Sequence, residues 1–395
     1  MKEFIMLLSK VEFQIVISFL VSVVITITAI PVIINISKLK DLMAEIEIRS
    51  SHDELTPTLG GVAIFAATLI SYFLWKIPSE GNEIHLAVSS LIILFFLGIK
   101  DDILILSPKK KILIQIAASL LLITLGDLRI TNLYGLLGYN SISYLPGVIL
   151  TTFIFIVLTN AVNLIDGIDG LAGSFGFISS ICFAILFYKL DLYAYVILSV
   201  SLSGSLLGFL RYNFSIKNKI FMGDTGSLIL GFLVSFFSIK YITINSSYAY
   251  DSRLENDAPL IVMVILILPL FDTLRMFSVR LFSGQSPFKG DRNHFHHILL
   301  DRGLSHWNAT IFLLIFNLLA IYLYSEFSNQ FSNNINFLLY FSLFVLYCLL
   351  AYFLSRNISK VNGSNSQYTN INKLKRLELA EEKKANLNNL NNLNN

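Results

Sequence analysis

The sequence predicts an all-α polytopic membrane protein. Hydrophobic residues make up 55% of its 395 residues and charged residues only 14%, and the mean hydropathy is +0.69. This composition excludes a soluble domain of this length, which carries more charge and fewer apolar side chains. The apolar residues also gather into long runs separated by polar gaps, and about 17 to 25 such residues form one helical span.

Eleven of these runs are predicted to be transmembrane helices. They cover approximately residues 11–34, 58–75, 84–99, 112–126, 146–164, 171–189, 191–211, 226–244, 258–281, 309–326 and 333–355, of which the third and fourth are short. No small-residue cleavage site follows the first run. We therefore interpret it as a retained helix and not as a removed signal peptide.

The basic residues predict the orientation of these spans. The gaps after spans 1, 3, 5, 7 and 9, with the C-terminal tail, hold 22 of the 29 lysines and arginines, against seven on the other side. Because basic residues concentrate in the cytoplasm, we expect the N-terminus outside and the C-terminus in the cytoplasm. The net charge of +3 says little about partners beyond a basic cytoplasmic face suited to anionic membrane lipids. We expect no nucleic-acid partner.

Two segments outside the spans have their own character. Residues 127–146 alternate β-forming residues with Gly and Asn, which predicts a small β-hairpin on the outer face. Residues 357–395 are polar and end in ANLNNLNNLNN. We therefore expect a transmembrane catalytic domain over residues 1–356 and a disordered cytoplasmic tail over residues 357–395.

The unusual polar motifs all fall in the gaps predicted to be cytoplasmic. They are RSSHDELTPTLGG (49–61), GIKDDILILSPKKK (98–111), NAVNLIDGIDGLAG (160–173), FMGDTGS (221–227) and DRNHFHH (291–297). The outer gaps contain no adjacent carboxylates and no pair of histidines. Solvated loops would not sort by side in this way, so we predict one cytoplasmic active site assembled from five loops.

Two acidic pairs indicate a bound cation or a charged substrate. Asp101 and Asp102 are adjacent, and like charges at close range are unfavourable unless a cation or proton is shared. An ionised carboxylate at the centre of a bilayer helix costs about 2.5 to 3.5 kcal/mol, so Asp166 and Asp169 are expected at a helix end. A solvated acidic loop and a helix cap are the simpler alternatives.

The asparagines of NAVNLIDGIDG precede these carboxylates at steps of three residues. Neighbouring members of such a series share a helical face. Asn163 and Asp166 can therefore point together, whereas Asn160 and Asp169 join them only where the helix breaks. The two glycines of the motif permit that break.

The remaining motif residues suit phosphate and nucleotide groups. Lys111 opens a span and suits a polyphosphate, with flanking charge as the alternative. Asp224 stands at the start of a span, where helix amides favour an anion, or where it serves as an N-cap. Phe221 is interpreted either as a stacking partner for a nucleobase or as an interfacial aromatic.

The histidine motif favours phosphate binding over zinc. The spacing of the histidines does not match common zinc sites. A cationic, hydrogen-bonding site for phosphates fits the motif better than zinc does, and its residues are Arg292, His294, His296 and His297. Solvated loop histidines are the alternative. Asp272 and Arg275, earlier in the chain, are interpreted as an i, i+3 ion pair.

Together, TPTLGG, GIKDDI, NAVNLIDGIDGLAG, FMGDTGS and DRNHFHH resemble the polyprenyl-phosphate N-acetylhexosamine-1-phosphate transferases, also called glycosyl transferase family 4. The resemblance runs in unbroken order over about residues 35–308. Within the family, the chain resembles the undecaprenyl-phosphate GlcNAc-1-phosphate transferases more than the phospho-MurNAc-pentapeptide translocases. The features that favour this branch are the eleven runs, the tail, the RSSH segment and the interrupted His-Phe-His-His. The acidic stretch 41–47 departs from the family's usual Pro-Asn-rich segment, which leaves nucleotide contacts there open.

The resemblance implies a reaction in the bacterial cytoplasmic membrane. Undecaprenyl phosphate attacks the β-phosphorus of a UDP-N-acetylhexosamine, with UDP-GlcNAc favoured, and gives a lipid-linked sugar pyrophosphate and UMP. This would be the first membrane step of cell-envelope polysaccharide synthesis, with Mg²⁺ as cofactor. The implied roles are metal binding by Asn163 and Asp224, catalysis by Asp101, Asp102, His294, His296 and His297, and substrate binding by Lys111, Asp166, Asp169, Phe221 and Arg292.

Other readings of the sequence stay open. Translocase activity is the alternative within the family, and a homodimer is a further expectation. A membrane transporter is the non-enzymatic alternative, but transporters usually carry ionisable residues or Gly/Pro breaks at the midplane. The centres of the predicted spans lack charged residues. A CDP-alcohol phosphotransferase is disfavoured because its Asp-Gly-x-x-Ala-Arg string is absent.

Overall fold

The computed structural model describes residues 10–40, 56–75, 82–104, 106–138, 141–247, 257–284 and 293–356. The regular elements of these residues are all helices. They are α2 (Val11–Leu39), α3 (Gly60–Phe73), α4 (Glu83–Leu104), α5 (Pro108–Leu125), η1 (Leu136–Gly138), α6 (Tyr144–Ile165), α7 (Leu171–Lys189), α8 (Tyr193–Asn213), α9 (Gly223–Ser247), α10 (Ala258–Ile265), α11 (Ile267–Phe282), α12 (Phe295–Asp301), α13 (His306–Phe327), η2 (Ser328–Gln330) and α14 (Asn333–Arg356).

Each of the eleven predicted runs coincides with a helix or a pair of helices. Eight of the described helices are long and apolar enough to cross a membrane, and the bent pair α10–α11 gives a ninth. α3 has only 14 residues, and α5 begins with three lysines after its first proline. The chain is therefore a polytopic membrane protein, while the count of eleven spans and their orientation stay predictions.

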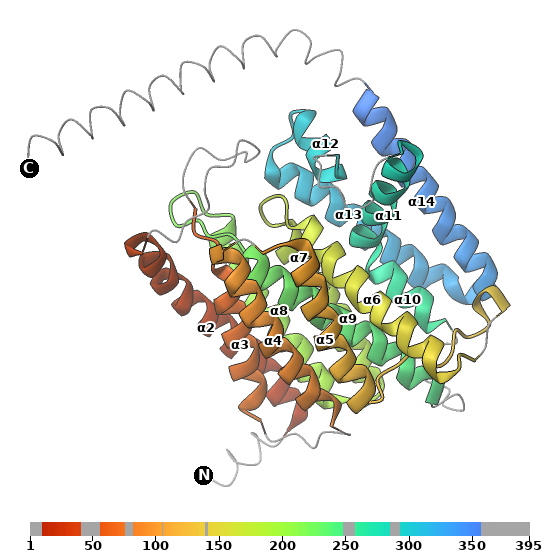
Figure 1. Cartoon of the computed structure of the whole chain (residues 1–395), viewed down its shortest axis with the longest axis horizontal. Helices are drawn as coiled ribbons and strands as arrows, with labels where there is room; N and C mark the ends of the chain where they lie inside the picture. Colours follow the sequence, from red (N-terminus) through yellow and green to blue (C-terminus); the bar gives the residue numbers. More distant parts are fainter. Residues whose placement is uncertain are drawn as a thin grey trace, which may run out of the picture.

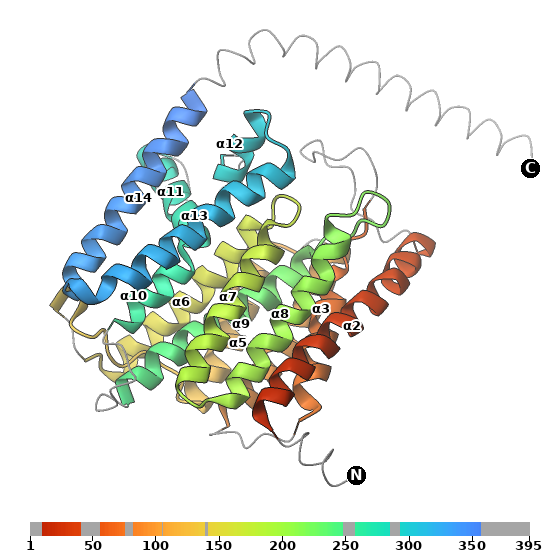
Figure 2. The same ribbon diagram turned by 180° about the vertical axis from the view of Figure 1, so that it is seen from behind.

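α9 is the central helix of the bundle. It packs against α3, α4, α6, α7 and α10, and nearly all of its apolar side chains from Leu228 to Ile239 are buried. In Figure 1, α2 and α3 lie on one side of it and α13 and α14 on the other, and Figure 2 shows the same order from behind. Large apolar side chains such as Leu20 of α2 and Leu346 of α14 are exposed, as expected of surfaces that face lipid.

The run 258–281 forms two helices where one was predicted. α10 and α11 meet at an angle of 81°. Pro269, in the first turn of α11, has no N–H to donate to the carbonyl of Ile265, four residues earlier. Asn317 of α13 donates to that carbonyl instead, at 3.2 Å. The bend gives α11 its own direction and places its residue Asp272 beside the start of α12.

The hairpin predicted at residues 127–146 is not confirmed. Its described residues contain the short 3-10 helix η1 and no strand. Tyr134, Gly135 and Gly138 have positive φ angles, and a left-handed backbone is incompatible with an extended strand. One backbone hydrogen bond, from Ile142 N–H to the Thr131 carbonyl at 2.8 Å, joins the two arms. The predicted disordered tail, 357–395, lies outside the described residues.

Candidate active site

The end of α4 and the start of α9 meet at Asp102. One carboxylate oxygen accepts the N–H of Asp224 at 2.7 Å, and the other accepts the N–H and the hydroxyl of Thr225 at 3.1 and 2.5 Å. The N–H groups of a first helical turn have no partner within the helix. Gly223 permits this approach, because its φ is +72° and a Cβ there would lie 2.8 Å from Asp102. The anion at this helix end is therefore Asp102, where the sequence had suggested a phosphate.

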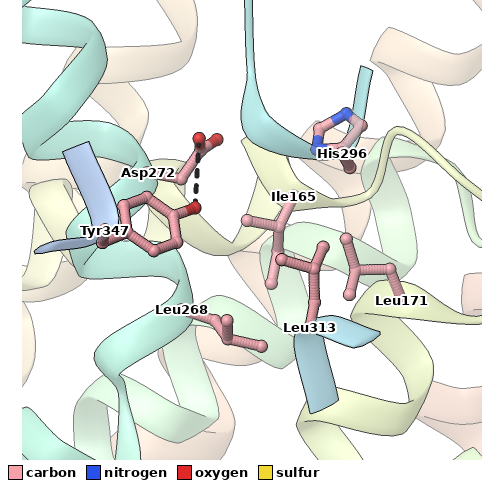
Figure 3. A pocket seen from close by; sticks show the side chains of 7 residues that line it. All are labelled: Ile165, Leu171, Leu268, Asp272, His296, Leu313 and Tyr347. Atoms are coloured by element: carbon pink, nitrogen blue, oxygen red, sulfur yellow. Dashed lines mark hydrogen bonds between the residues drawn. The ribbon is translucent and has the colours of Figure 1, made fainter. Parts of the chain in front are cut away.

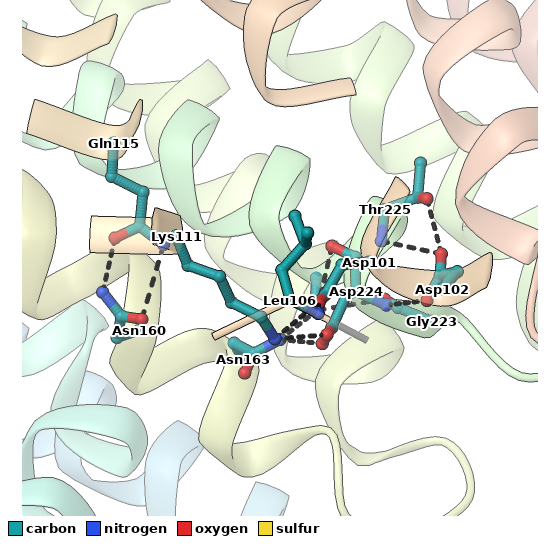
Figure 4. Close-up of polar contacts among 11 residues, drawn as sticks. Asp101, Asp102, Leu106, Lys111, Gln115, Asn160, Asn163, Gly223, Asp224 and Thr225 are labelled. Carbon is teal, nitrogen blue, oxygen red and sulfur yellow. Dashed lines mark hydrogen bonds and ion pairs between the residues drawn. The ribbon is translucent and has the colours of Figure 1, made fainter. Parts of the chain in front are cut away.

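Lys111 connects the two acidic motifs. Its ammonium group pairs with Asp101 and lies 2.8 Å from Oδ2 of Asp224. Asp101 is 4% exposed, and its other oxygen accepts the backbone N–H of Leu106 at 2.6 Å. Figure 4 shows how the lysine side chain extends from α5 to these carboxylates. Lys111 supplies the shared cation that closely spaced carboxylates require.

Asn163 joins the same cluster from the end of α6. Its Nδ2 donates to Oδ1 of Asp224 and to Oγ of Ser227, both at 2.7 Å. Asn160, one turn earlier, pairs instead with Gln115 of α5, with its Nδ2 2.6 Å from Oε1. Only the later of the two asparagines therefore reaches the carboxylates (Figure 4).

The donor set at Asp224 and Asn163 fits a magnesium ion. The described residues contain no group of three or more His, Cys, Asp or Glu side chains arranged to hold a metal. Mg²⁺ does not require such a group, because it keeps several waters and binds through one or two carboxylates and substrate phosphates. The Asp224 carboxylate and the Asn163 amide meet through Nδ2 of Asn163, so the amide oxygen would have to turn toward Asp224 for both residues to hold one ion.

Asp166 and Asp169 lie in the turn between α6 and α7 but differ in their surroundings. Burial alone would raise the pKa of Asp169, but hydrogen bonds from His306 and Lys219 lower it below its usual value. These partners lie 3.0 and 2.6 Å away. The Asp166 carboxylate makes no hydrogen bond or ion pair with a described residue, and burial, with the charge of Asp224, raises its pKa well above 3.8.

The FMGD motif contacts the TPTLGG motif through its backbone. Phe221 N–H donates to the Pro57 carbonyl at 2.8 Å, and the Phe221 carbonyl accepts the N–H of Gly60 at 3.0 Å. The Phe221 ring centroid lies 5.5 Å from Nζ of Lys219. Lys219 also binds Asp169, so the residues predicted at the nucleotide end are connected by a lysine that the sequence motifs did not single out.

The histidine segment packs over this same turn. His296 is 2% exposed, and its ring lies directly against Gly167, where a Cβ would collide with it. Burial lowers the pKa of His296 to about 3, so its ring is neutral and offers hydrogen bonding without charge. The His297 ring centroid lies 4.3 Å from that of His296. Arg292 and residues 41–55, including the acidic stretch, lie outside the described residues.

A small pocket lies under the histidine segment. It is lined by Ile165, Leu171, Leu268, Asp272, His296, Leu313 and Tyr347. Figure 3 shows its apolar side chains on one side and Asp272 at its polar edge, with the Tyr347 hydroxyl 3.5 Å from Oδ1 of Asp272. His296 therefore rests on packing among α6, α7, α11, α13 and α14.

The predicted site residues thus fall into three connected groups. The first is a hydrogen-bonded and ion-paired network of Asp101, Asp102, Lys111, Asn163 and Asp224. Beside it lie the turn with Asp166 and Asp169, linked to Phe221 by Lys219, and the histidine segment. Carboxylates, an amide and a lysine thus gather at the start of the central helix of this membrane bundle, and groups of these kinds can hold a polyphosphate together with a cation.

Comparison with known proteins identifies the family. The profile of glycosyl transferase family 4 matches residues 84–242. The chain is 30% identical over 366 residues to the probable undecaprenyl-phosphate N-acetylglucosaminyl 1-phosphate transferase of Bacillus subtilis (strain 168), which covers 89% of this chain and 92% of that protein. The chain belongs to glycosyl transferase family 4.

Two further relatives carry similar names. The decaprenyl-phosphate N-acetylglucosaminephosphotransferase of Mycobacterium leprae (strain TN) is 32% identical over 308 residues, covering 72% of this chain and 76% of that protein. The undecaprenyl-phosphate alpha-N-acetylglucosaminyl 1-phosphate transferase of Escherichia coli (strain K12) is 26% identical over 324 residues, covering 80% and 85%. The similarity therefore extends well beyond the five motifs.

Proposed function

We propose that this protein transfers GlcNAc-1-phosphate from UDP-GlcNAc to undecaprenyl phosphate and releases UMP. An oxygen of the lipid phosphate forms a bond to the β-phosphorus. The bond from that phosphorus to the oxygen shared with the α-phosphorus breaks, and UMP leaves with the bonding electrons. The names of the relatives support the acceptor and the GlcNAc-1-phosphate unit.

The observation that carries this proposal is the Asp101–Lys111–Asp224 cluster with Asn163 beside it. Joining a phosphate to a diphosphate requires charge neutralisation and in-line placement more than covalent chemistry from the protein. The cluster places a lysine and two carboxylates from α4, α5 and α9 within direct contact. These groups can hold both a divalent cation and phosphate oxygens.

Asn163 and Asp224 are the residues that would hold Mg²⁺. The bound ion would supply charge stabilisation to the diphosphate and the leaving group. Lys111 would hold phosphate oxygens once Asp224 binds the cation. Asp102 already accepts three hydrogen bonds from α9, which favours a positioning role over proton abstraction. A lipid phosphate is largely ionised near neutral pH, so the need for a base is small.

The turn between α6 and α7 would bind the nucleotide. Asp169 stays ionised because Lys219 and His306 contact it. Phe221, beside the same lysine, offers an aromatic face for the uracil ring. The histidine segment approaches this turn from the other side through His296, which favours a role for it at the diphosphate.

We place this site on the cytoplasmic face of the bacterial inner membrane, within eleven spans. The support is the excess of lysine and arginine in the gaps that carry the motifs. UDP-sugars are cytoplasmic metabolites, which agrees with this orientation. Residues 1–356 would then form the catalytic domain, and 357–395 a cytoplasmic tail.

The test is an assay of the purified full-length protein with undecaprenyl phosphate, Mg²⁺ and one of three donors. The donors are UDP-GlcNAc, UDP-GalNAc and UDP-MurNAc-pentapeptide. We expect UMP release to be fastest with UDP-GlcNAc, to stop when EDTA removes the metal, and to be lost in Asp224→Ala. Asp301→Asn, which changes an exposed carboxylate on α12, is the control. Full activity in Asp224→Ala, or no UMP from any donor, would reject the proposal, and preference for UDP-MurNAc-pentapeptide would identify a translocase.

A further inference from the structure

The buried carboxylate of Asp272 on α11 has more partners than its predicted ion pair. Arg275 Nη2 is 3.3 Å from Oδ1, as the i, i+3 spacing suggested. Oδ2 lies 2.6 Å from Nδ1 of His294, and Oδ1 also accepts the backbone N–H of Phe295 at 2.9 Å. The Asp272 residue is only 3% exposed. This carboxylate therefore joins α11 to the histidine segment.

Asp272 acts on both the backbone and the side chain where α12 begins. Phe295 is the first residue of α12, and its N–H is one of those that lack a partner within the helix. His294, the preceding residue, provides no side-chain cap. Asp272 satisfies the Phe295 N–H and contacts the His294 ring with its other oxygen. One side chain thus fixes both where α12 starts and how its adjacent histidine is turned.

The contact leaves a single ring nitrogen of His294 for another partner. Nδ1 faces Asp272, and within the part of the chain that the structure describes no hydrogen bond reaches Nε2. His296 differs, because its Nε2 is buried against Gly167. The two rings lie nearly parallel with centroids 5.7 Å apart. Fixing the His294 ring therefore also fixes one side of the His296 ring.

A second layer from α14 supports the same carboxylate. The Tyr347 hydroxyl is 3.5 Å from Oδ1 of Asp272 (Figure 3), and its ring meets Phe295 edge to face at 4.7 Å. Arg302, at the end of α12, donates to the Leu354 carbonyl of α14 at 2.6 Å. α14 therefore contacts both ends of the short helix that follows His294.

We propose that Asp272 is a positioning residue that acts through His294. By accepting the Nδ1–H, it orients the ring so that Nε2–H of the imidazolium form can donate to the diphosphate of the bound UDP-sugar. The same carboxylate balances the positive charge that Arg275 places beside the ring. This inference rests on the proposed function and assigns to Asp272 no direct contact with substrate.

A double-mutant cycle tests whether the two residues act together. UMP release is measured for the wild type, Asp272→Asn, His294→Asn and the double variant, with kcat and KM determined separately. We expect each single change to lower kcat by about 10- to 100-fold, the effect seen where a carboxylate orients a ligating histidine. The kcat of the double variant should not fall below that of the less active single variant. If the fold-losses in kcat of the two single variants multiply in the double variant, the proposal is overturned. A normal kcat in Asp272→Asn would also overturn it.

A second pair of variants leaves Asp272 intact and so covers the case in which Asp272→Asn does not fold. His294→Asn places an amide nitrogen near the position of Nδ1, whereas His294→Gln places one near Nε2. We expect His294→Gln to retain about tenfold more activity than His294→Asn, because only the Gln amide keeps the charge-assisted hydrogen bond to the diphosphate. Equal activities, or the reverse order, would overturn the proposal.

The controls separate this inference from the proposed function. Asp301→Asn makes the same chemical change at an exposed position of α12 and should leave kcat unaltered. If the wild type and this control release no UMP, the proposed function itself fails. If both are active and the cycle is additive, only the role of Asp272 is rejected.

Discussion

The Nζ atom of Lys111 lies 2.8 Å from Oδ2 of Asp224, although the two residues are 113 positions apart in the sequence. The same ammonium group pairs with Asp101. It therefore occupies the place between two carboxylates that a divalent cation would also favour. Mg²⁺ and Lys111 should compete for these oxygens before the diphosphate arrives.

Lys111→Met should have two opposite effects. Transfer should fall by about 10- to 100-fold, because a charge-assisted hydrogen bond to phosphate contributes about 1.5 to 3 kcal/mol. The Mg²⁺ concentration for half-maximal transfer should also fall, since no lysine then competes for the carboxylates. Titration of Mg²⁺ in the UMP assay measures both. Lys110→Met, at an exposed position, is the matched control, and a higher Mg²⁺ requirement in Lys111→Met would contradict the competition.

Substitution of Asp102 distinguishes positioning from proton abstraction. Asn keeps one of the two acceptor oxygens that α9 uses, whereas Ala keeps neither, and loss of an acceptor at a helix start costs about 0.5 to 2 kcal/mol. If Asp102 positions the start of α9, Asp102→Asn should retain more transfer and a higher unfolding temperature than Asp102→Ala. Equal loss of transfer in both, with unchanged unfolding temperature, would instead indicate a base. Thr225→Val, which removes only the 2.5 Å hydroxyl contact, should have a smaller effect than Asp102→Ala.

Lys219→Met should weaken nucleotide binding more than chemistry. The lysine contacts Asp169 and the Phe221 ring, both of which we place at the uridine end. KM for UDP-GlcNAc should rise by about tenfold, the effect of losing one charged hydrogen bond, with little change in kcat. The neighbouring Lys217 is exposed, and Lys217→Met should match the wild type. A loss confined to kcat would show that Lys219 has another role.

The stability contribution of Asp169 should depend on pH. Its pKa is lowered in the folded protein, so its ionised form stabilises the fold above the ordinary carboxyl pKa, and this contribution is lost as the pH falls through the folded pKa. Asp169→Asn should therefore unfold at a lower temperature than the wild type at about pH 7, and the difference should shrink below about pH 4. Thermal unfolding in detergent at both pH values measures this. A difference that grows in acid would show the sign to be wrong.

The helices were predictable because a membrane span needs a long apolar run, and the sequence contains these runs with clear polar ends. The break at Leu266 was not predicted. Its cause is Pro269 together with Asn317, which lies 52 positions from the carbonyl that it satisfies. The hairpin prediction used the β-forming residues of 127–146 but could not include the left-handed backbone at Tyr134.

The site was predictable where its residues form dense local motifs. Asp101, Asp102 and Asn163 stand out because acidic and amide groups between apolar runs are costly unless they bind something. Lys219 and His306 were missed because their importance comes from contact with Asp169, and sequence spacing does not encode that contact. Asp272 was noticed only as a local ion pair. Its place in an apolar run was a signal for a buried partner, but nothing in the sequence named His294.

The central claim is that the β-phosphorus of UDP-GlcNAc is transferred together with the sugar. The most direct test is to locate a radioactive phosphorus label in the products. UDP-GlcNAc carrying radioactive phosphorus at either the α or the β position is incubated with the protein, undecaprenyl phosphate and Mg²⁺. We predict that β-label appears in the lipid product and α-label in UMP, and that Asp224→Ala abolishes both. Retention of both labels in a soluble UDP product, with only the sugar transferred, would contradict the account.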